Sequence, residues 1–237
     1  MPAASVNAPS ASRCVDESVT IVLFSTGPRQ GLRHPGWSIT VREAASARPE
    51  ASPAKAAGKP SRTRFTGDAQ RKELIDGGAA RAVFAGGCFW GVEHYFEKVD
   101  GVQLVTSGYA GASKEAPTYK QVSTGTTGHA EAVEVLYDAA RVDFETLARL
   151  FFEIHDPTQK DRQGPDVGRQ YRSVIYFSGE EERAVADRLI AILKGKGLEV
   201  VTEVAALERF WPAEDYHQDY YERTGGEPYC HVRVKRF

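Results

Sequence analysis

From about residue 81, apolar positions follow the periods of regular secondary structure. Short apolar runs predict buried strands at 82–85, 102–110, 130–137, 173–177 and 199–206. Apolar residues recur at helical spacing in the stretches between them, which predicts helices over 89–99, 142–154 and 178–197. Beyond these elements the chain is aromatic and polar, so we expect an irregular C-terminal tail.

Capping residues support two of these helices. Asp143 stands where it can cap the helix that carries Leu147, Leu150, Phe151 and Ile154 on one face. Ser178 and Glu181 have the spacing of a capping box, and that helix closes on glycine. Because strands alternate with helices, we expect an α+β fold: a two-layer α/β sandwich, ferredoxin-like, with the irregular tail added.

Residues 1 to about 65 have neither period and are rich in Ala, Ser, Pro and Arg, as is typical of linkers or disorder. The strand-like VTIVLF at 19–24 is too short and too far along to be a convincing signal peptide. The composition is compatible with an organellar transit segment, a bland spacer or an upstream extension of the reading frame. We therefore expect a poorly structured extension at 1–79 and a folded domain at 80–237.

Composition narrows the function classes. The chain of 237 residues is 41% hydrophobic and 26% charged, with a net charge of -2, so nothing favours nucleic acid or a membrane surface. No apolar run approaches the length of a membrane span. The three cysteines, Cys14, Cys88 and Cys230, form neither a disulfide framework nor a CxxC pair. Cys14 lies in the extension, and we assign it no role.

The stretch GGCFWGVEHYF at 86–96 places Cys88 where a strand becomes a helix. The positive end of a helix favours a thiolate, which predicts a lowered pKa and a reactive sulfur. The two glycines before it allow a tight turn and close approach of a substrate. An isolated cysteine after a strand is more often a small buried hydrophobe, but the neighbouring glycines and aromatics favour the reactive interpretation.

Glu131 opens the predicted strand 130–137 and shares its alternating face with Val133, Val135 and Tyr137. A carboxyl on an apolar face is desolvated, which raises its pKa and makes it a general acid near neutral pH. An edge-strand glutamate that reaches water is the alternative, and the strand register does not decide between them. The polar segment 155–173 carries further candidate groups, because a loop of this kind in a compact domain is often functional.

The motifs GCFWG at 87–91, GYAG at 108–111, TYKQVSTGTTGHAEAV at 118–133, HDPT at 155–158 and RQGPDVGRQYRS at 162–173 resemble peptide methionine sulfoxide reductase A. The resemblance runs from about Val83 to His231 in the right order, and implies that 80–237 is the catalytic domain. One departure is Ala112, where the family has a second glycine after GYAG.

The resemblance implies specific roles. Cys88 matches the nucleophile, whose thiolate attacks the sulfoxide sulfur and becomes a sulfenic acid. Glu131 matches the acid that protonates the sulfoxide oxygen. The remaining matches are the phenols on that oxygen (Tyr119 and Tyr171), the aromatic pair around the substrate methyl group (Phe89 and Trp90) and the substrate-orienting acid (Asp166).

Cys230, in a tail with glycines and a proline, matches a resolving cysteine that attacks the sulfenic acid in many family members. Thioredoxin, or a small thiol in vitro, then reduces the disulfide, and no bound cofactor is implied. The class acts on the S epimer of methionine sulfoxide, in oxidised proteins or free. We expect a cytoplasmic monomer, with organelle targeting by the extension as an alternative, and a tail that must move to bring Cys230 to Cys88.

Three other functions are open to these residues. A cysteine hydrolase could use Cys88 with His129 or His155 and Asp156. A non-enzymatic metal module could use Cys88, His94, Cys230 and His231, although the spacing is poor for a zinc site. A thiol peroxidase would also form a sulfenic acid, but would not need a methyl-binding aromatic pair. We expect His129 and His155 to be hydrogen-bonded structural residues, and Trp211, Tyr216, Tyr220 and Tyr221 to serve packing.

Overall fold

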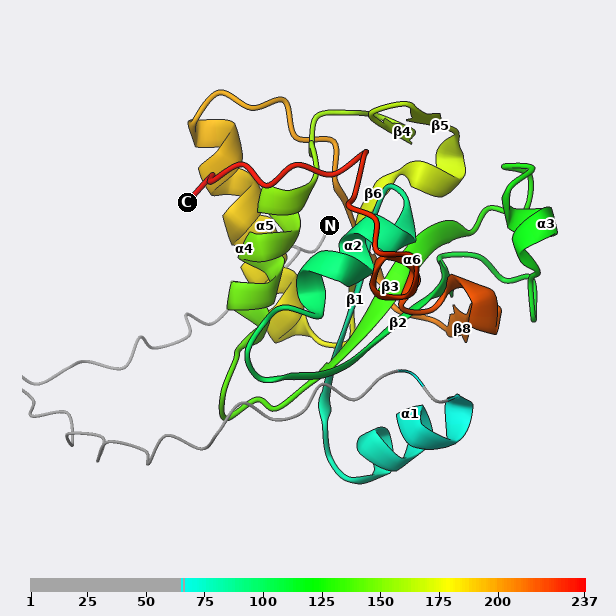
Figure 1. Ribbon diagram of the computed structural model, residues 1–237. Coiled ribbons are helices and arrows are strands. Elements are labelled where there is room, and N and C mark those ends of the chain that lie inside the picture. Colours follow the sequence, from blue (N-terminus) through cyan, green and yellow to red (C-terminus); the bar gives the residue numbers. More distant parts are fainter. Residues whose placement is uncertain (1–64, 66) are drawn as a thin grey trace, which may run out of the picture. The chain divides into compact units, whose positions relative to one another are not determined.

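A six-stranded mixed sheet forms one layer of the computed structural model, which describes residue 65 and residues 67–237 (Figure 1). The strands lie in the order β7-β6-β1-β3-β2-β8. All neighbours are antiparallel except β6 and β7, which are parallel. The bounds are β1 Ala80–Gly86, β2 Val102–Ala110, β3 Ala130–Tyr137, β6 Ser173–Phe177, β7 Glu203–Ala206 and β8 Phe210–Pro212.

Helices connect these strands in a recurring pattern. Helix α2 (Phe89–Phe96) lies between β1 and β2, α4 (Phe144–Ile154) follows β3, and α5 (Glu180–Gly195) lies between β6 and β7. The four strands β6-β1-β3-β2 with helices after β1 and β3 have the β-α-β-β-α-β, ferredoxin-like arrangement. The predicted α+β fold is therefore confirmed.

The main core lies between the sheet and helices α2, α4 and α5. At its centre the fully buried Phe84 of β1 stacks on Phe96, Phe144 and Phe151, with ring centroids 5.1, 5.8 and 5.2 Å away. Each buried aromatic contributes a large apolar area and a preferred ring geometry. These contacts fix α2 and α4 against β1, and thereby fix the position of the residue that precedes α2.

Smaller elements surround the sheet. They are α1 (Asp68–Asp76), α3 (Tyr119–Val122), the hairpin β4 (Arg162–Gln163) with β5 (Asp166–Val167), the 3₁₀ turns η1 (Arg169–Tyr171) and η2 (Asp215–His217), and α6 (Tyr220–Thr224). Helix α1 lies within the segment 1–79, for which we expected little structure. Its Arg71 pairs with the buried Glu134 of β3. VTIVLF and Cys14 lie outside the described residues.

Two local predictions are corrected. The capping box of Ser178 and Glu181 does not form, because the Ser178 N–H donates to Glu182 Oε2 at 2.7 Å and Gly179 is the N-cap. The last predicted strand is shorter and begins at Glu203. By contrast, Asp143 caps α4 as predicted, since its side chain accepts a bond from the Thr146 N–H at 2.7 Å.

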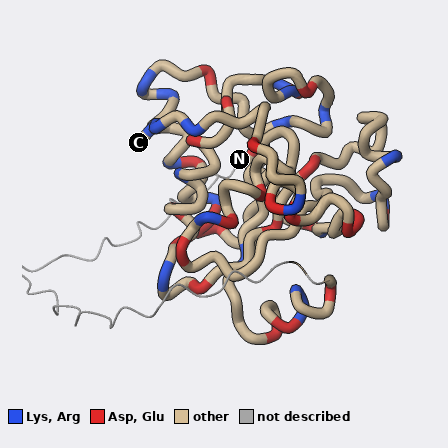
Figure 2. The backbone as a smooth tube through the Cα atoms, in the orientation of Figure 1, with Lys and Arg blue, Asp and Glu red and all other residues tan. Residues whose placement is uncertain are grey.

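Charges of both signs are interspersed along the described chain (Figure 2), in keeping with the small net charge. Within the same residues, no helix is both long and apolar enough to cross a membrane.

Candidate active site

Cys88 stands at the N-cap of α2, directly after the turn that follows β1, as the sequence predicts. Gly87 has a φ of 100°, a conformation that favours glycine, and a Cβ there would lie 2.5 Å from Gln163 Cβ. The Cys88 side chain is only 6% exposed. The turn therefore presents the sulfur in an enclosed position at the start of a helix.

Glu131 is desolvated, which decides between the two interpretations of this residue. It lies on β3, a strand flanked by β1 and β2, so the edge-strand alternative is wrong. Its carboxylate accepts a bond from the Phe89 N–H at 3.2 Å, one residue after Cys88. Burial raises the pKa of Glu131 to about 8, although the bond from Phe89 acts in the opposite direction. The carboxyl is therefore protonated near neutral pH and can donate a proton.

Tyr119 and Tyr171 approach the same place from α3 and η1. Burial raises the pKa of both phenols, and nearby Glu131 and Cys88 act in the same direction. Both hydroxyls therefore stay protonated and can donate hydrogen bonds to an oxygen bound beside Glu131.

Phe89 and Trp90 begin α2 with their ring centroids 6.2 Å apart. Trp90 stacks on Tyr220 of α6 at 3.7 Å, and its indole N–H lies 3.2 Å from His217 Nδ1. The His217 ring also lies 4.5 Å from that of Tyr119. His217 is thus a site residue that the sequence analysis missed. Tyr220 serves packing as expected, and the residue it packs against is Trp90 of the site.

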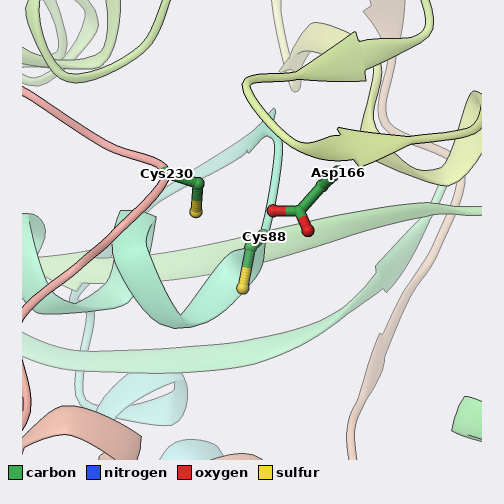
Figure 3. Close-up of side chains that lie close together, drawn as sticks. All are labelled: Cys88, Asp166 and Cys230. Atoms are coloured by element: carbon green, nitrogen blue, oxygen red, sulfur yellow. The ribbon is translucent and has the colours of Figure 1, made fainter.

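The tail brings Cys230 to Cys88 without any large movement. The two sulfurs and a carboxylate oxygen of Asp166 lie within 4.8 Å of one another. Figure 3 shows these three side chains close together. Both cysteines are buried and free. Asp166 Oδ1 accepts a bond from the Tyr229 hydroxyl at 3.3 Å. The expected tail movement before resolution is therefore corrected: the tail is irregular, but it is docked on the site.

The pKa of Cys88 also differs from expectation. The hydrogen bond with Cys230, and then burial, raise the pKa of Cys88, whereas bonds with Cys88 and His231 lower the pKa of Cys230. The helix N-terminus does not outweigh these contacts. In this arrangement the more acidic thiol belongs to Cys230, and Cys88 holds its proton until the contact changes.

The geometry does not support a hydrolase. His155 is fully engaged, with Nδ1 2.6 Å from the Phe151 carbonyl oxygen and Nε2 2.8 Å from Ser173 Oγ. Burial lowers the pKa of His155 to about 3, so the ring stays neutral and structural, as expected. His129 is also buried, but its ring nitrogens have no hydrogen-bond partner among the described residues, so the hydrogen bonds expected for it are corrected. Asp156 accepts bonds from Thr158 instead of orienting a histidine.

Three of the four residues of the alternative metal module, Cys88, Cys230 and His231, lie near one another, but the fourth, His94, contacts Glu227 instead. His94 Nε2 lies 3.4 Å from Glu227 Oε2, and His231 Nε2 lies 2.8 Å from the Gly86 carbonyl oxygen. In the described part of the chain, Glu97, Asp219 and Glu222 form a separate group with ligand atoms within 4.8 Å, where a cation could bind.

Comparison with known proteins gives a consistent result. A family model for peptide methionine sulfoxide reductase matches residues 80–237. The peptide methionine sulfoxide reductase MsrA of Nautilia profundicola is 54% identical over 150 residues, which are 63% of this chain and 87% of the relative. The MsrA of Haloquadratum walsbyi is 48% identical over 155 residues, 65% of this chain and 89% of the relative.

Solved structures agree. Reduced Mxr1 from Saccharomyces cerevisiae has a TM-score of 0.60 at 31% identity, covering 65% of this chain and 91% of that one. Methionine sulfoxide reductase A of Corynebacterium diphtheriae has a TM-score of 0.58 at 37% identity, covering 62% and 76%.

Proposed function

The chain belongs to the peptide methionine sulfoxide reductase family, and we propose that Cys88 is the nucleophile with which this enzyme reduces methionine sulfoxide. The catalytic domain spans 80–237. In the first step Cys88 loses its proton as its contact with Cys230 changes, and the thiolate attacks the sulfoxide sulfur while the oxygen is protonated. Methionine leaves as the thioether, and Cys88 retains the oxygen as a sulfenic acid. One thiol and one sulfoxide thus become one sulfenic acid and one thioether.

The observation that carries the proposal is the protonated, buried carboxyl of Glu131, which accepts a hydrogen bond from the N–H of the residue that follows Cys88. Sulfoxide oxygen is a poor leaving group unless it is protonated, so a neutral acid held in place is the group the reaction needs. Tyr119 and Tyr171 donate hydrogen bonds to the same oxygen. Their raised pKa values keep both phenols in the donating form over the physiological range.

Substrate binding is assigned to the aromatic pair and to Asp166. Phe89 and Trp90 surround the S-methyl group, since an apolar group is best recognised by aromatic surface. His217 and Tyr220 hold the Trp90 ring in place. Asp166 orients the substrate from β5, where its carboxylate lies close to the sulfurs of Cys88 and Cys230. The substrates are oxidised proteins or peptides, and free methionine sulfoxide where it fits the pocket.

Resolution is assigned to Cys230. Its sulfur is within 4.8 Å of Cys88, so a small approach forms a disulfide. Thioredoxin then reduces the disulfide in the cell, and a small thiol can do so in vitro. The enzyme acts as a monomer without a bound cofactor.

The proposal is tested with pure epimers of a methionine sulfoxide peptide. The S epimer should be consumed completely, and a racemic mixture should stop at half conversion. Cys88→Ser should abolish the reaction, because a hydroxyl ionises far less readily than a thiol. Retained activity in this variant would remove Cys88 from the mechanism. Faster turnover of hydrogen peroxide than of the sulfoxide would instead favour a thiol peroxidase.

A further inference from the structure

His231 lies directly beside the sulfur of Cys230, with Nδ1 3.0 Å from Sγ. Its other ring nitrogen, Nε2, lies 2.8 Å from the Gly86 carbonyl oxygen. A carbonyl oxygen can only accept, so Nε2 must carry the proton. In the neutral ring Nδ1 is therefore bare and lies against the Cys230 sulfur, where it can take up the thiol proton. In keeping with this, the bond with Cys88 and then the contact with His231 lower the pKa of Cys230. The backbone of β1 thus fixes the tautomer in which His231 accepts a proton from Cys230.

The ring occupies a socket made by the glycines around Cys88. A Cβ on Gly91 would lie 2.2 Å from His231 Nδ1, and a Cβ on Gly87 would lie 3.5 Å from Cε1. Gly91 is in the first turns of α2, where alanine would otherwise be preferred. The glycine at this position therefore leaves room for the imidazole, which is 2% exposed.

The chain at His231 and directly after it is held to the fold. The Tyr95 hydroxyl donates to the His231 carbonyl oxygen at 3.5 Å, and Arg233 pairs with Glu153 at 2.8 Å. The Val234 N–H donates to the Glu153 carbonyl oxygen at 2.7 Å. These contacts hold the imidazole and the Cys230 sulfur in a fixed relation to α2.

We propose that His231 is the general base of resolution: its Nδ1 takes the proton of the Cys230 thiol as that sulfur attacks the Cys88 sulfenic acid. This inference rests on the proposed role of Cys230. The S–S bond forms as the S–O bond of the sulfenic acid breaks. The departing hydroxide takes up one proton to become water, and His231 releases the proton that it took from Cys230, so the number of protons balances. The products are a disulfide and water, and the imidazole returns to its neutral form.

Two other groups near Cys230 are poorer acceptors. Glu131 gives up its proton in the first step but, because its pKa is about 8, takes one up again near neutral pH before Cys230 reacts. Asp166 accepts from the Tyr229 hydroxyl through Oδ1, and a carboxylate is intrinsically a much weaker base than imidazole. The fixed tautomer makes His231 the acceptor whose geometry suits the Cys230 thiol.

The experiment measures resolution alone, in the full chain. Enzyme reacts once with methionine sulfoxide without reductant, and quenched samples are analysed for Cys88 sulfenic acid, trapped with dimedone, and for the disulfide. His231→Gln keeps a donor for the Gly86 oxygen, and His231→Asn keeps an acceptor beside Cys230, but neither side chain can take a proton. In both variants the sulfenic acid should persist, with disulfide formation slowed by roughly 10²–10⁴-fold. His94→Gln is the matched control, since His94 lies on α2 near the tail residue Glu227 but is not part of the Cys230–His231 pair. Disulfide formation in this variant should be as fast as in wild type.

A purely structural role is separated by chemical rescue. In His231→Ala, free imidazole should restore disulfide formation, whereas pyrazole, a ring of the same size that is far less basic, should not. Equal rescue by both rings, or wild-type resolution in His231→Gln, overturns the proposal. Slow resolution in Asp166→Asn but not in the His231 variants would assign the base to Asp166 instead. If Cys230→Ser resolves as wild type does, the assignment of Cys230 fails first, and that result is distinct from the outcomes above.

Discussion

Replacing Glu131 by glutamine should give a protein that is more stable at neutral and alkaline pH, yet far less active. Glutamine has nearly the same shape, and its carbonyl oxygen can accept the bond that the Phe89 N–H makes to Glu131. It cannot ionise and cannot donate an acidic proton. The substitution therefore removes the titration of Glu131 while leaving the packing of β3 close to that of the wild type.

The magnitude follows from the pKa of Glu131, which is about 8 in the folded chain against 4.5 ordinarily. The folded state holds the proton more tightly than the unfolded chain does. The protonated Glu131 therefore stabilises the folded state fully below pH 4.5, and this contribution to the free energy of unfolding is lost as the pH rises through about 8. At about 1.4 kcal/mol per pKa unit, wild type should lose roughly 3 kcal/mol by pH 7 and about 5 kcal/mol above pH 9.

Urea unfolding at several pH values measures this directly. Between pH 5 and pH 8, the free energy of unfolding of Glu131→Gln relative to wild type should rise by about 3 kcal/mol. Titration of other groups cancels in this comparison, since both proteins share them. In a single-turnover assay at pH 7, methionine formation should slow by roughly 10²–10⁴-fold. Parallel stability curves for the two proteins would refute the raised pKa, and an unchanged rate would leave the tyrosines as the only partners of the sulfoxide oxygen.

Three further substitutions test individual contacts. Asp143→Ala removes the side-chain acceptor for the Thr146 N–H and should lower the free energy of unfolding by about 1 kcal/mol in urea, with no change in substrate specificity. Gly91→Ala should expel the His231 ring and expose the tail, so that a thiol reagent modifies Cys230 faster than in wild type; equal labelling rates would show that the socket is not restrictive. Cys230→Ser should still form about one methionine per enzyme, but turnover with thioredoxin should collapse and a small thiol should partly restore it; normal cycling would mean that another thiol reduces Cys88.

The local features of the fold were predictable where neighbouring residues in the chain determine them. Asp143 caps a helix, and the alternating face of 130–137 places Glu131 among apolar residues. The sequence pattern does not show which strands lie beside 130–137, so it did not exclude an exposed Glu131 carboxylate on an edge strand. The sheet order, with β3 between β1 and β2, excludes it. The expected capping box failed because Glu182, one residue further on, reaches the same N–H.

The candidate site shows the same division. Cys88 was predictable because strand, glycines, cysteine and helix are consecutive in the chain. Its pKa was not, because the contact with Cys230 depends on how a distant tail docks. His217 and His231 reach the site from that tail. The sequence offered His231 only as a ligand of the alternative metal module, and no apolar period pointed to His217. The density of aromatic and polar residues at 211–221 was the one available signal for His217.

The central claim is that Cys88 takes the oxygen and Cys230 resolves it. Mass spectrometry of the protein after one turnover with a methionine sulfoxide peptide, without any reductant, tests it most directly. We predict one equivalent of methionine peptide and a single new crosslinked fragment joining Cys88 to Cys230, preceded at short times by an added oxygen on Cys88. Consumption of the sulfoxide with Cys88 unmodified throughout would contradict the account.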